Sequence, residues 1–240
     1  MPTDPCTLII LVFIIKVLNS KTTMSESAEV AGKNYNESLR LYSSLNCHHE
    51  MASLYQKLAN ISMMTRKYTT AITQFEKCLV TTKVLNGSSC ESVADMYYNL
   101  GVVHDRTRCF SKAITCFDFC ISINMASSST NALLYKSRVL SKIGKFDEAL
   151  DILSLLLDKD GFNNDLKLHA DVLIAKANTY DLMNKKDMAM ESYLLALSAL
   201  RKLPNNEDSI SNACHDIANK YLRKKNFDIA LKFASEAFDM

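Results

Sequence analysis

The sequence predicts an all-α fold, a solenoid in which antiparallel helix pairs stack side by side. Three observations support this prediction: glycine and proline are scarce, apolar residues make up 48% of the 240 residues, and a pattern of small and bulky residues recurs along the chain. With only 5 glycines and 3 prolines, long helices joined by short connections are favoured. The apolar content is sufficient for a buried core.

A pattern centred on an alanine recurs five times. Successive copies of this alanine lie 42, 36, 40 and 41 residues apart. Packed helices lie about 8–10 Å apart, and only a small side chain fits where their axes cross most closely. An aromatic residue stands three positions before the alanine in four of the five copies, and we expect it to fill the space between helices. We therefore place the second helix of each unit around Ala71, Ala113, Ala149, Ala189 and Ala230.

The first helix of each unit is predicted upstream, where a second small residue recurs twelve positions before the alanine. A residue suited to the core stands four positions earlier, and this spacing lies on one helix face. Short polar segments that contain Gly, Asn, Ser or Pro separate the units and favour turns. The upstream small residues are Ala59, Gly101, Ser137, Ala177 and Ala218.

The combined pattern resembles the tetratricopeptide repeat. The clearest copy is MYYNLG at residues 96–101, followed by Phe110 and Ala113. The resemblance covers about residues 50–240 and implies a right-handed superhelical α-solenoid. Units of 40–42 residues also resemble the kinesin light chain and nephrocystin subgroup. The chain departs from the repeat pattern in having no Trp and in placing Lys186 where an aromatic residue is usual.

Three segments are distinguished along the chain. Residues 48–240 are predicted to form five tetratricopeptide-like helix pairs, and residues 24–47 a partial N-terminal repeat or cap. Residues 1–23 contain an apolar run at residues 8–18, which is about half of the ~20 residues that a membrane-spanning helix needs. Three interpretations of residues 1–23 are left open: a signal or anchor, an extra packed helix, or an upstream extension of a chain that starts at Met24.

Catalytic motifs are not found in the sequence. It contains no glycine-rich phosphate-binding motif, no H-E-x-x-H and no G-x-S-x-G. We therefore predict that the protein is not an enzyme and holds no cofactor and no metal. Cys116 and Cys120 stand one helical turn apart, but Cys120 takes a core position of the repeat and is interpreted as a small apolar residue. Reduced cysteines favour a cytoplasmic location; a secretory or membrane-associated location through residues 8–18 is the alternative.

The resemblance implies that first helices line a concave groove, and it thereby identifies candidate residues for binding a peptide. Asparagine recurs at one position of three first helices, and its amide can both donate to and accept from a peptide backbone. Basic residues add positive charge, so an extended and partly acidic protein segment suits this surface. The candidate binding residues are Asn60, Tyr98, Arg106, Arg138, Lys142, Asn178, Asn219 and Arg223.

The predicted function is a non-catalytic protein–protein interaction scaffold. Lys and Arg number 28 against 26 Asp and Glu, and this net charge of +2 gives no electrostatic basis for binding nucleic acid. A membrane is not an expected partner unless residues 8–18 act as an anchor, and self-association is left open. Two alternatives remain, a cargo or assembly adaptor of the kinesin light chain type and a membrane-tethered repeat protein.

Overall fold

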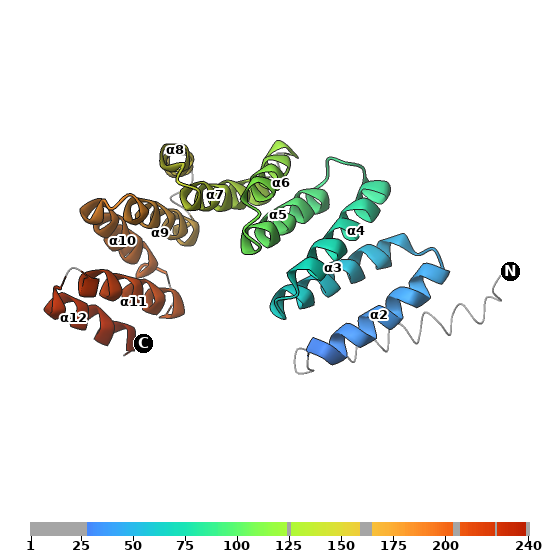
Figure 1. Ribbon diagram of the computed structural model, residues 1–240, viewed down its shortest axis with the longest axis horizontal. Helices are drawn as coiled ribbons and strands as arrows, with labels where there is room; N and C mark the ends of the chain where they lie inside the picture. Colours follow the sequence, from blue (N-terminus) through green and yellow to red (C-terminus); the bar gives the residue numbers. More distant parts are fainter. Residues whose placement is uncertain (1–27, 124–125, 159–164, 204–206, 224, 239–240) are drawn as a thin grey trace. The chain divides into compact units, whose positions relative to one another are not determined.

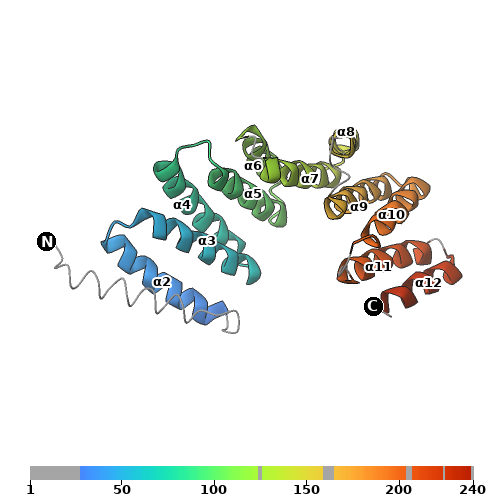
Figure 2. The same ribbon diagram turned by 180° about the vertical axis from the view of Figure 1, so that it is seen from behind.

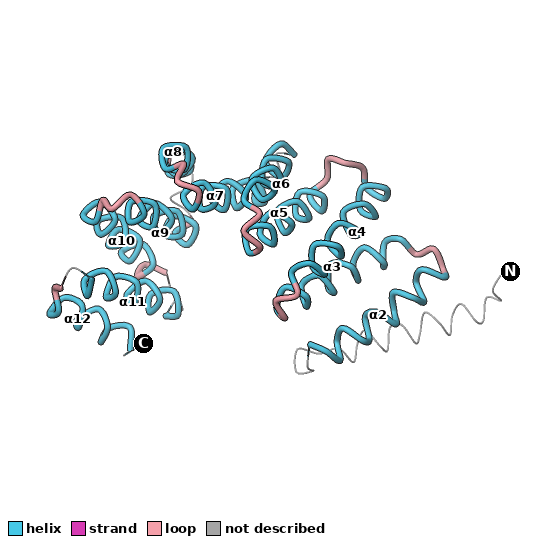
Figure 3. The backbone as a smooth tube through the Cα atoms, in the orientation of Figure 1, coloured by secondary structure: helices cyan, strands magenta, loops and turns pink. Residues whose placement is uncertain are grey.

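The computed structural model describes residues 28–123, 126–158, 165–203, 207–223 and 225–238 (Figure 1). Every regular element within these ranges is an α-helix, and short turns connect most neighbouring helices (Figure 3). The predicted all-α fold is therefore confirmed. Residues 1–23, for which three interpretations were left open, lie outside the described residues.

The helices keep the order in which the sequence pattern repeats (Figures 1 and 2). Grouping them into a cap and five repeat units stays a prediction. Within the described ranges the helices are α2 (Ala28–Ser44), α3 (His48–Met64), α4 (Tyr68–Asn86), α5 (Glu91–Arg106), α6 (Phe110–Ile123), α7 (Ala126–Lys142), α8 (Phe146–Leu157), α9 (Leu166–Leu182), α10 (Lys186–Leu200), α11 (Glu207–Arg223) and α12 (Phe227–Phe238).

The chain divides into two units, of which the first ends at Ala132. In the first unit α3 packs on α4, α5 packs on α6, α4 also contacts α5, and α2 contacts α3. The core shared by α4 and α5 contains Phe75, Met96 and Leu100, all buried. Helix α4 therefore buries apolar residues against α5, the first helix that follows it in the chain.

The second unit begins at Leu133. Here α9 packs on α10 and α11 packs on α12, while α8 contacts α9 and α10 contacts α11. Tyr193 and Leu197 of α10 and Ile217 of α11 are among its most deeply buried side chains and belong to one core. The same arrangement of second helix against following first helix thus recurs in this unit.

The recurring small residues are buried, and at one of them the closeness of the helices can be measured. Each of the five alanines of the second helices is at most 1% exposed. At Gly101 on α5, an added Cβ atom would lie 2.5 Å from the Cε1 atom of Phe117 on α6. The aromatic ring thus lies directly on the backbone of the neighbouring helix, and a side chain at Gly101 has no room.

The turn inside each predicted pair has the same backbone conformation in all five copies. The residue five positions before the alanine has a positive φ, between 58° and 84°. The N–H of the next residue donates to a carbonyl five residues back, as from Cys109 to His104 at 2.8 Å, which is a helix end of the Schellman type. Glycine adopts this conformation most readily, yet three of these residues are Arg or Lys: Arg66, Arg108, Gly144, Asn184 and Lys225.

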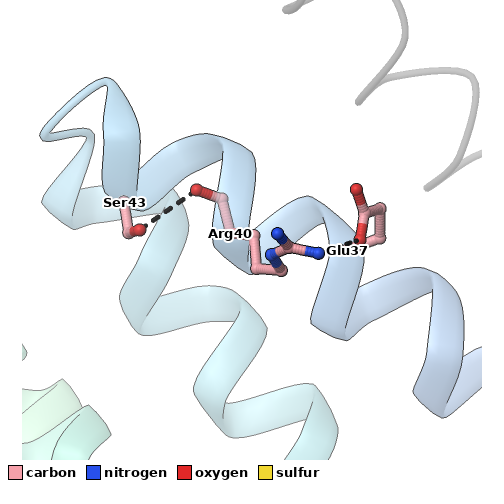
Figure 4. A network of polar contacts seen from close by, with 3 residues as sticks. All are labelled: Glu37, Arg40 and Ser43. Atoms are coloured by element: carbon pink, nitrogen blue, oxygen red, sulfur yellow. Dashed lines mark hydrogen bonds and ion pairs between the residues drawn. The ribbon is translucent and has the colours of Figure 1, made fainter.

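Helix α2 is held mainly by apolar contacts. Tyr42 of α2 and Leu54 of α3 are both buried and pack together. On its outer face, Arg40 pairs with Glu37 at 3.5 Å, and the Ser43 hydroxyl donates to the backbone oxygen of Arg40 at 3.0 Å (Figure 4). Both charged side chains are exposed, and such surface pairs contribute little to stability.

Replacing Gly101 with Ala should lower the free energy of unfolding by about 1–3 kcal/mol, because the added Cβ overpacks the contact with Phe117. The matched control is Gly32→Ala on α2, where no atom lies within 4 Å of the added Cβ and the higher helix propensity of Ala should raise stability by up to about 1 kcal/mol. Urea unfolding followed by circular dichroism measures both changes. A stability gain for Gly101→Ala would contradict this account.

Candidate peptide-binding surface

The candidate binding residues lie on first helices in both units, which are described separately. In the first unit, Asn60 of α3 and Arg106 in the last turn of α5 are exposed. Tyr98 of α5 is half-buried, and its ring centroid lies 6.2 Å from that of Phe117 at a tilt of 53°. Tyr98 therefore contributes to the α5–α6 packing with one part of its ring and reaches solvent with another.

In the second unit, Arg138 is a basic candidate whose side chain has a defined aromatic contact. Its guanidinium carbon lies 5.0 Å from the ring centroid of Tyr135, one turn earlier on α7. The guanidinium also attracts the carboxyl group of Asp171 on α9. Burial raises the pKa of Asp171, while the charges of Arg138 and Lys167 act in the opposite direction. The contact with the ring limits the directions in which Arg138 can point.

Asn178 of α9 is the asparagine candidate with a defined partner. The hydroxyl of Tyr193 on α10 donates a hydrogen bond to the Oδ1 atom of Asn178. Burial raises the pKa of Tyr193, so this hydroxyl keeps its proton at neutral pH. The bond fixes the amide orientation through its carbonyl oxygen and leaves the amide NH₂ group, which can donate, on the exposed residue.

An ion pair that the sequence pattern did not predict lies beside Asn178. Lys220 of α11 pairs with Asp181 of α9, and its ammonium lies 5.7 Å from the ring centroid of Tyr193. Helices α9, α10 and α11 are thereby joined by polar contacts next to their apolar core. The sequence did contain a signal for Tyr193, because it stands where the other copies have Phe, Leu or Ala: Phe75, Phe117, Leu153 and Ala234.

The remaining candidates are all at least partly exposed. Lys142 and Arg223 are exposed in the last turns of α7 and α11, and Asn219 of α11 is half-buried. The structure therefore places every candidate on a first helix, and it links Asn178 to a second helix through Tyr193. The alignment of Asn60, Asn178 and Asn219 as one binding row stays a prediction.

Acidic residues are interleaved with the basic candidates of the second unit, which the sequence pattern did not anticipate. Asp171 lies within the field of Arg138, and Asp181 is paired with Lys220. The positive charge of Arg138 is therefore partly offset by Asp171, a carboxylate of the chain itself.

Several of the potentially reactive side chains among the described residues are buried. The seven cysteines in the described part of the chain are free thiols, and three of them are buried. Burial raises the pKa of both Cys116 and Cys120 to about 11, so these thiols are protonated and weakly nucleophilic at neutral pH. Burial also lowers the pKa of His104, which keeps its imidazole neutral. Among the described residues, no three His, Cys, Asp or Glu side chains are grouped to hold a metal ion.

Two further observations concern a depression in the surface and the length and hydropathy of the helices. An open depression of ≈ 570 Å³ in the second unit is lined by residues of α10 and α11 and the following turn, including Glu191, Leu194 and Tyr221, and by none of the candidate binding residues. No helix in the described ranges is both long enough and apolar enough to span a bilayer.

A tetratricopeptide repeat model matches residues 170–199, a range that begins within α9 and ends within α10. The matched range contains the Asn178–Tyr193 hydrogen bond and both small residues of that unit, Ala177 and Ala189. No curated protein sequence gives a significant match to the chain. The predicted repeat type is thus confirmed for one helix pair at the level of sequence.

Solved structures extend the likeness to the whole fold. BtubC (BKLC) from P. vanneervenii is 14% identical, with 90% of this chain and 91% of that chain covered and a TM-score of 0.73. The apo form of RapI is 16% identical, with 99% and 84% covered and a TM-score of 0.71. A putative kinesin light chain from Podosopora anserina, with nearly identical TPR-like repeats, is 14% identical, with 82% and 94% covered and a TM-score of 0.54.

The matched repeat and these likenesses define the class of protein. The chain has the fold of a tetratricopeptide-type helical solenoid, and kinesin light chain-like repeats are among its structural neighbours. It carries a tetratricopeptide repeat at residues 170–199. The predicted resemblance and fold class are both confirmed.

Replacing Tyr193 with Phe should lower the free energy of unfolding by about 0.5–1.5 kcal/mol, because the Asn178 carbonyl loses its donor without a change in core volume. The matched control is Tyr97→Phe, which removes a hydroxyl that accepts a hydrogen bond from Lys83 at 2.7 Å on a half-buried residue and should cost less. Chemical unfolding of both variants measures the difference. Equal losses in the free energy of unfolding would show that the Tyr193–Asn178 hydrogen bond contributes no more to stability than the Lys83–Tyr97 hydrogen bond.

Proposed function

We propose that the chain is a non-catalytic scaffold that binds an extended, partly acidic segment of a partner protein along its first helices. The fold supports the coarser part of this proposal, since tetratricopeptide-type solenoids serve protein interaction. The single observation that carries the finer part is the Asn178 amide, which is exposed and held in one orientation by the buried Tyr193 hydroxyl.

A fixed amide suits the backbone of an extended peptide. The NH₂ group of Asn178 can donate to a peptide carbonyl whatever the side chain beside it. Because Tyr193 already holds the amide, little side-chain entropy is lost when the peptide binds, and preorganisation of this kind increases affinity. The proposal therefore assigns Asn178 to the peptide backbone.

Arg138 is assigned to an acidic side chain of the ligand. Its guanidinium is restrained by the Tyr135 ring, and a guanidinium can hold a carboxylate through two parallel hydrogen bonds. Asp171 competes for the same cation, so the affinity reflects an exchange of one carboxylate for another. Lys142 and Arg223, both exposed, add longer-range attraction that salt screens.

The cytoplasm is the compartment that we propose for this scaffold. The support is its seven described thiols, of which Cys78, Cys120 and Cys214 are buried in the core, because thiols remain reduced in a reducing compartment. A cargo-adaptor role of the kinesin light chain type is not proposed, because the likeness to those repeats is one of fold.

Binding should be measured on the full chain with a synthetic library of extended peptides in which the number of acidic residues varies. Affinity should rise with acidic content and fall with salt. Asn178→Ala should weaken binding of the tightest peptide by about 10-fold, and Arg138→Gln by about 10-fold or more, as expected when a hydrogen bond or a charged hydrogen bond is lost. Asp171→Asn should strengthen binding, because it removes the competing carboxylate.

The control is Lys145→Gln, an exposed basic residue in the turn before α8 that pairs with Glu148 at 2.7 Å. It removes the same charge as Arg138→Gln but does not lie on a first helix, and it should weaken binding much less than Arg138→Gln does. Affinity that is independent of acidic content, or equal losses for Arg138→Gln and Lys145→Gln, would contradict the proposal.

A further inference from the structure

Helix α12 carries a stripe of exposed apolar residues, which we call the α12 stripe: Phe227, Leu231, Ala234 and Phe238. Phe227 is 63% exposed, Leu231 71% and Phe238 90%, and Ala234 is also exposed. Successive members are four, three and four residues apart, which places them on one face of the helix. An adjoining side of α12 packs on the core of the second unit through Ala230, Phe233 and Ala237.

The equivalent positions of the other second helices are covered to a much greater extent. Four residues after the recurring alanine, where α12 has Ala234, the other copies are at most 1% exposed: Phe75, Phe117, Leu153 and Tyr193. One residue after the alanine, where α12 has Leu231, Ile72, Ile114 and Leu150 are half-buried and Met190 is buried. The expectation that an aromatic residue fills the space between helices three positions before the alanine also fails at Phe227.

A following first helix covers these positions. In the second unit, Met190, Tyr193 and Leu197 of α10 share a core with Ile210, Cys214 and Ile217 of α11. In the first unit, Ile72, Phe75 and Leu79 of α4 share one with Met96 and Leu100 of α5. The α12 stripe thus has the position and the chemistry of a surface that packs against another helix. Within the described residues, no other helix covers this stripe on α12.

We propose that two copies of the chain associate through this stripe, with the two α12 helices antiparallel across a twofold axis. The order of side chains along the stripe is self-complementary in that arrangement. A centre midway between Leu231 and Ala234 sets Leu231 of each copy against Ala234 of the other, so that a large side chain meets a small one. The same centre sets Phe227 against Phe238. A twofold interface uses one patch on both copies, and here one stripe supplies both the projecting and the receiving residues.

The size of the stripe fits a weak dimer. Aromatic side chains bury about 150–250 Å² each when fully covered. With two phenylalanines and one leucine largely exposed, roughly 400 Å² of each copy is available for burial, or about 800 Å² in total. Stable interfaces bury about 1,200–2,000 Å², so the dimer should form in a concentration-dependent way. The inference concerns second-helix residues and does not depend on the peptide-binding proposal.

Sedimentation velocity of the full chain over a wide concentration series tests the proposal. The sedimenting mass of the unmodified chain should rise from that of one chain to that of two, without larger species. Leu231→Lys should weaken the dimer by about 100-fold or more, since a central contact is lost in both copies. The matched control is Leu155→Lys on α8, a leucine that is 64% exposed but lies outside the stripe; it should associate as the unmodified chain does. Circular dichroism checks that both variants are folded.

A mixing experiment tests the geometry. Leu231→Lys and Leu231→Glu should each be monomeric alone, and an equimolar mixture should form heterodimers, because the twofold axis brings the two positions within one helical turn of each other. A monomeric unmodified chain at every concentration would overturn the proposal. So would equal losses for Leu155→Lys and Leu231→Lys, open-ended polymers, or a mixture that stays monomeric.

Discussion

The close approach of neighbouring helices at small residues is the constraint on which the rest of this structure depends. Phe117 of α6 lies against the backbone of Gly101 on α5, and the five alanines of the second helices are buried. This approach lets Phe75 of α4 reach the core between α4 and α5 in the first unit, and Tyr193 of α10 reach the core between α10 and α11 in the second. The first-helix surface is thereby left for polar residues, of which Arg138 and Asn178 are held by ring and hydroxyl contacts.

The fold could be predicted from the sequence because steric contact repeats with the chain. A helix crossing admits only small residues, so the five alanines and the small residues twelve positions before them appear as a period without knowledge of the structure. The turns within the helix pairs could be predicted from the sequence only in part. Gly144 and Asn184 are residues that adopt positive φ, whereas Arg66, Arg108 and Lys225 take the same conformation because the tight link between two packed helices requires it.

The candidate binding surface was predictable in position but not in its electrostatics. The repeat spacing assigned Asn178 and Arg138 to first helices, where the structure has them. The groups that act on them come from other helices: Tyr193 of α10 donates to Asn178, and Asp171 of α9 interacts electrostatically with Arg138. Contacts of this kind depend on the rotation of one helix against another, which a period in the sequence does not specify. The Lys220–Asp181 pair was missed for the same reason.

Hydrogen exchange of the full chain with and without the tightest acidic peptide tests the central claim most directly, because it reports which helices a ligand protects. The account predicts slower amide exchange in α7, α9 and α11, with the largest change around Asn178, and little change in α8 and α12. Protection confined to the second helices, or the same protection by a peptide that lacks acidic residues, would contradict the claim that the first helices form the binding surface.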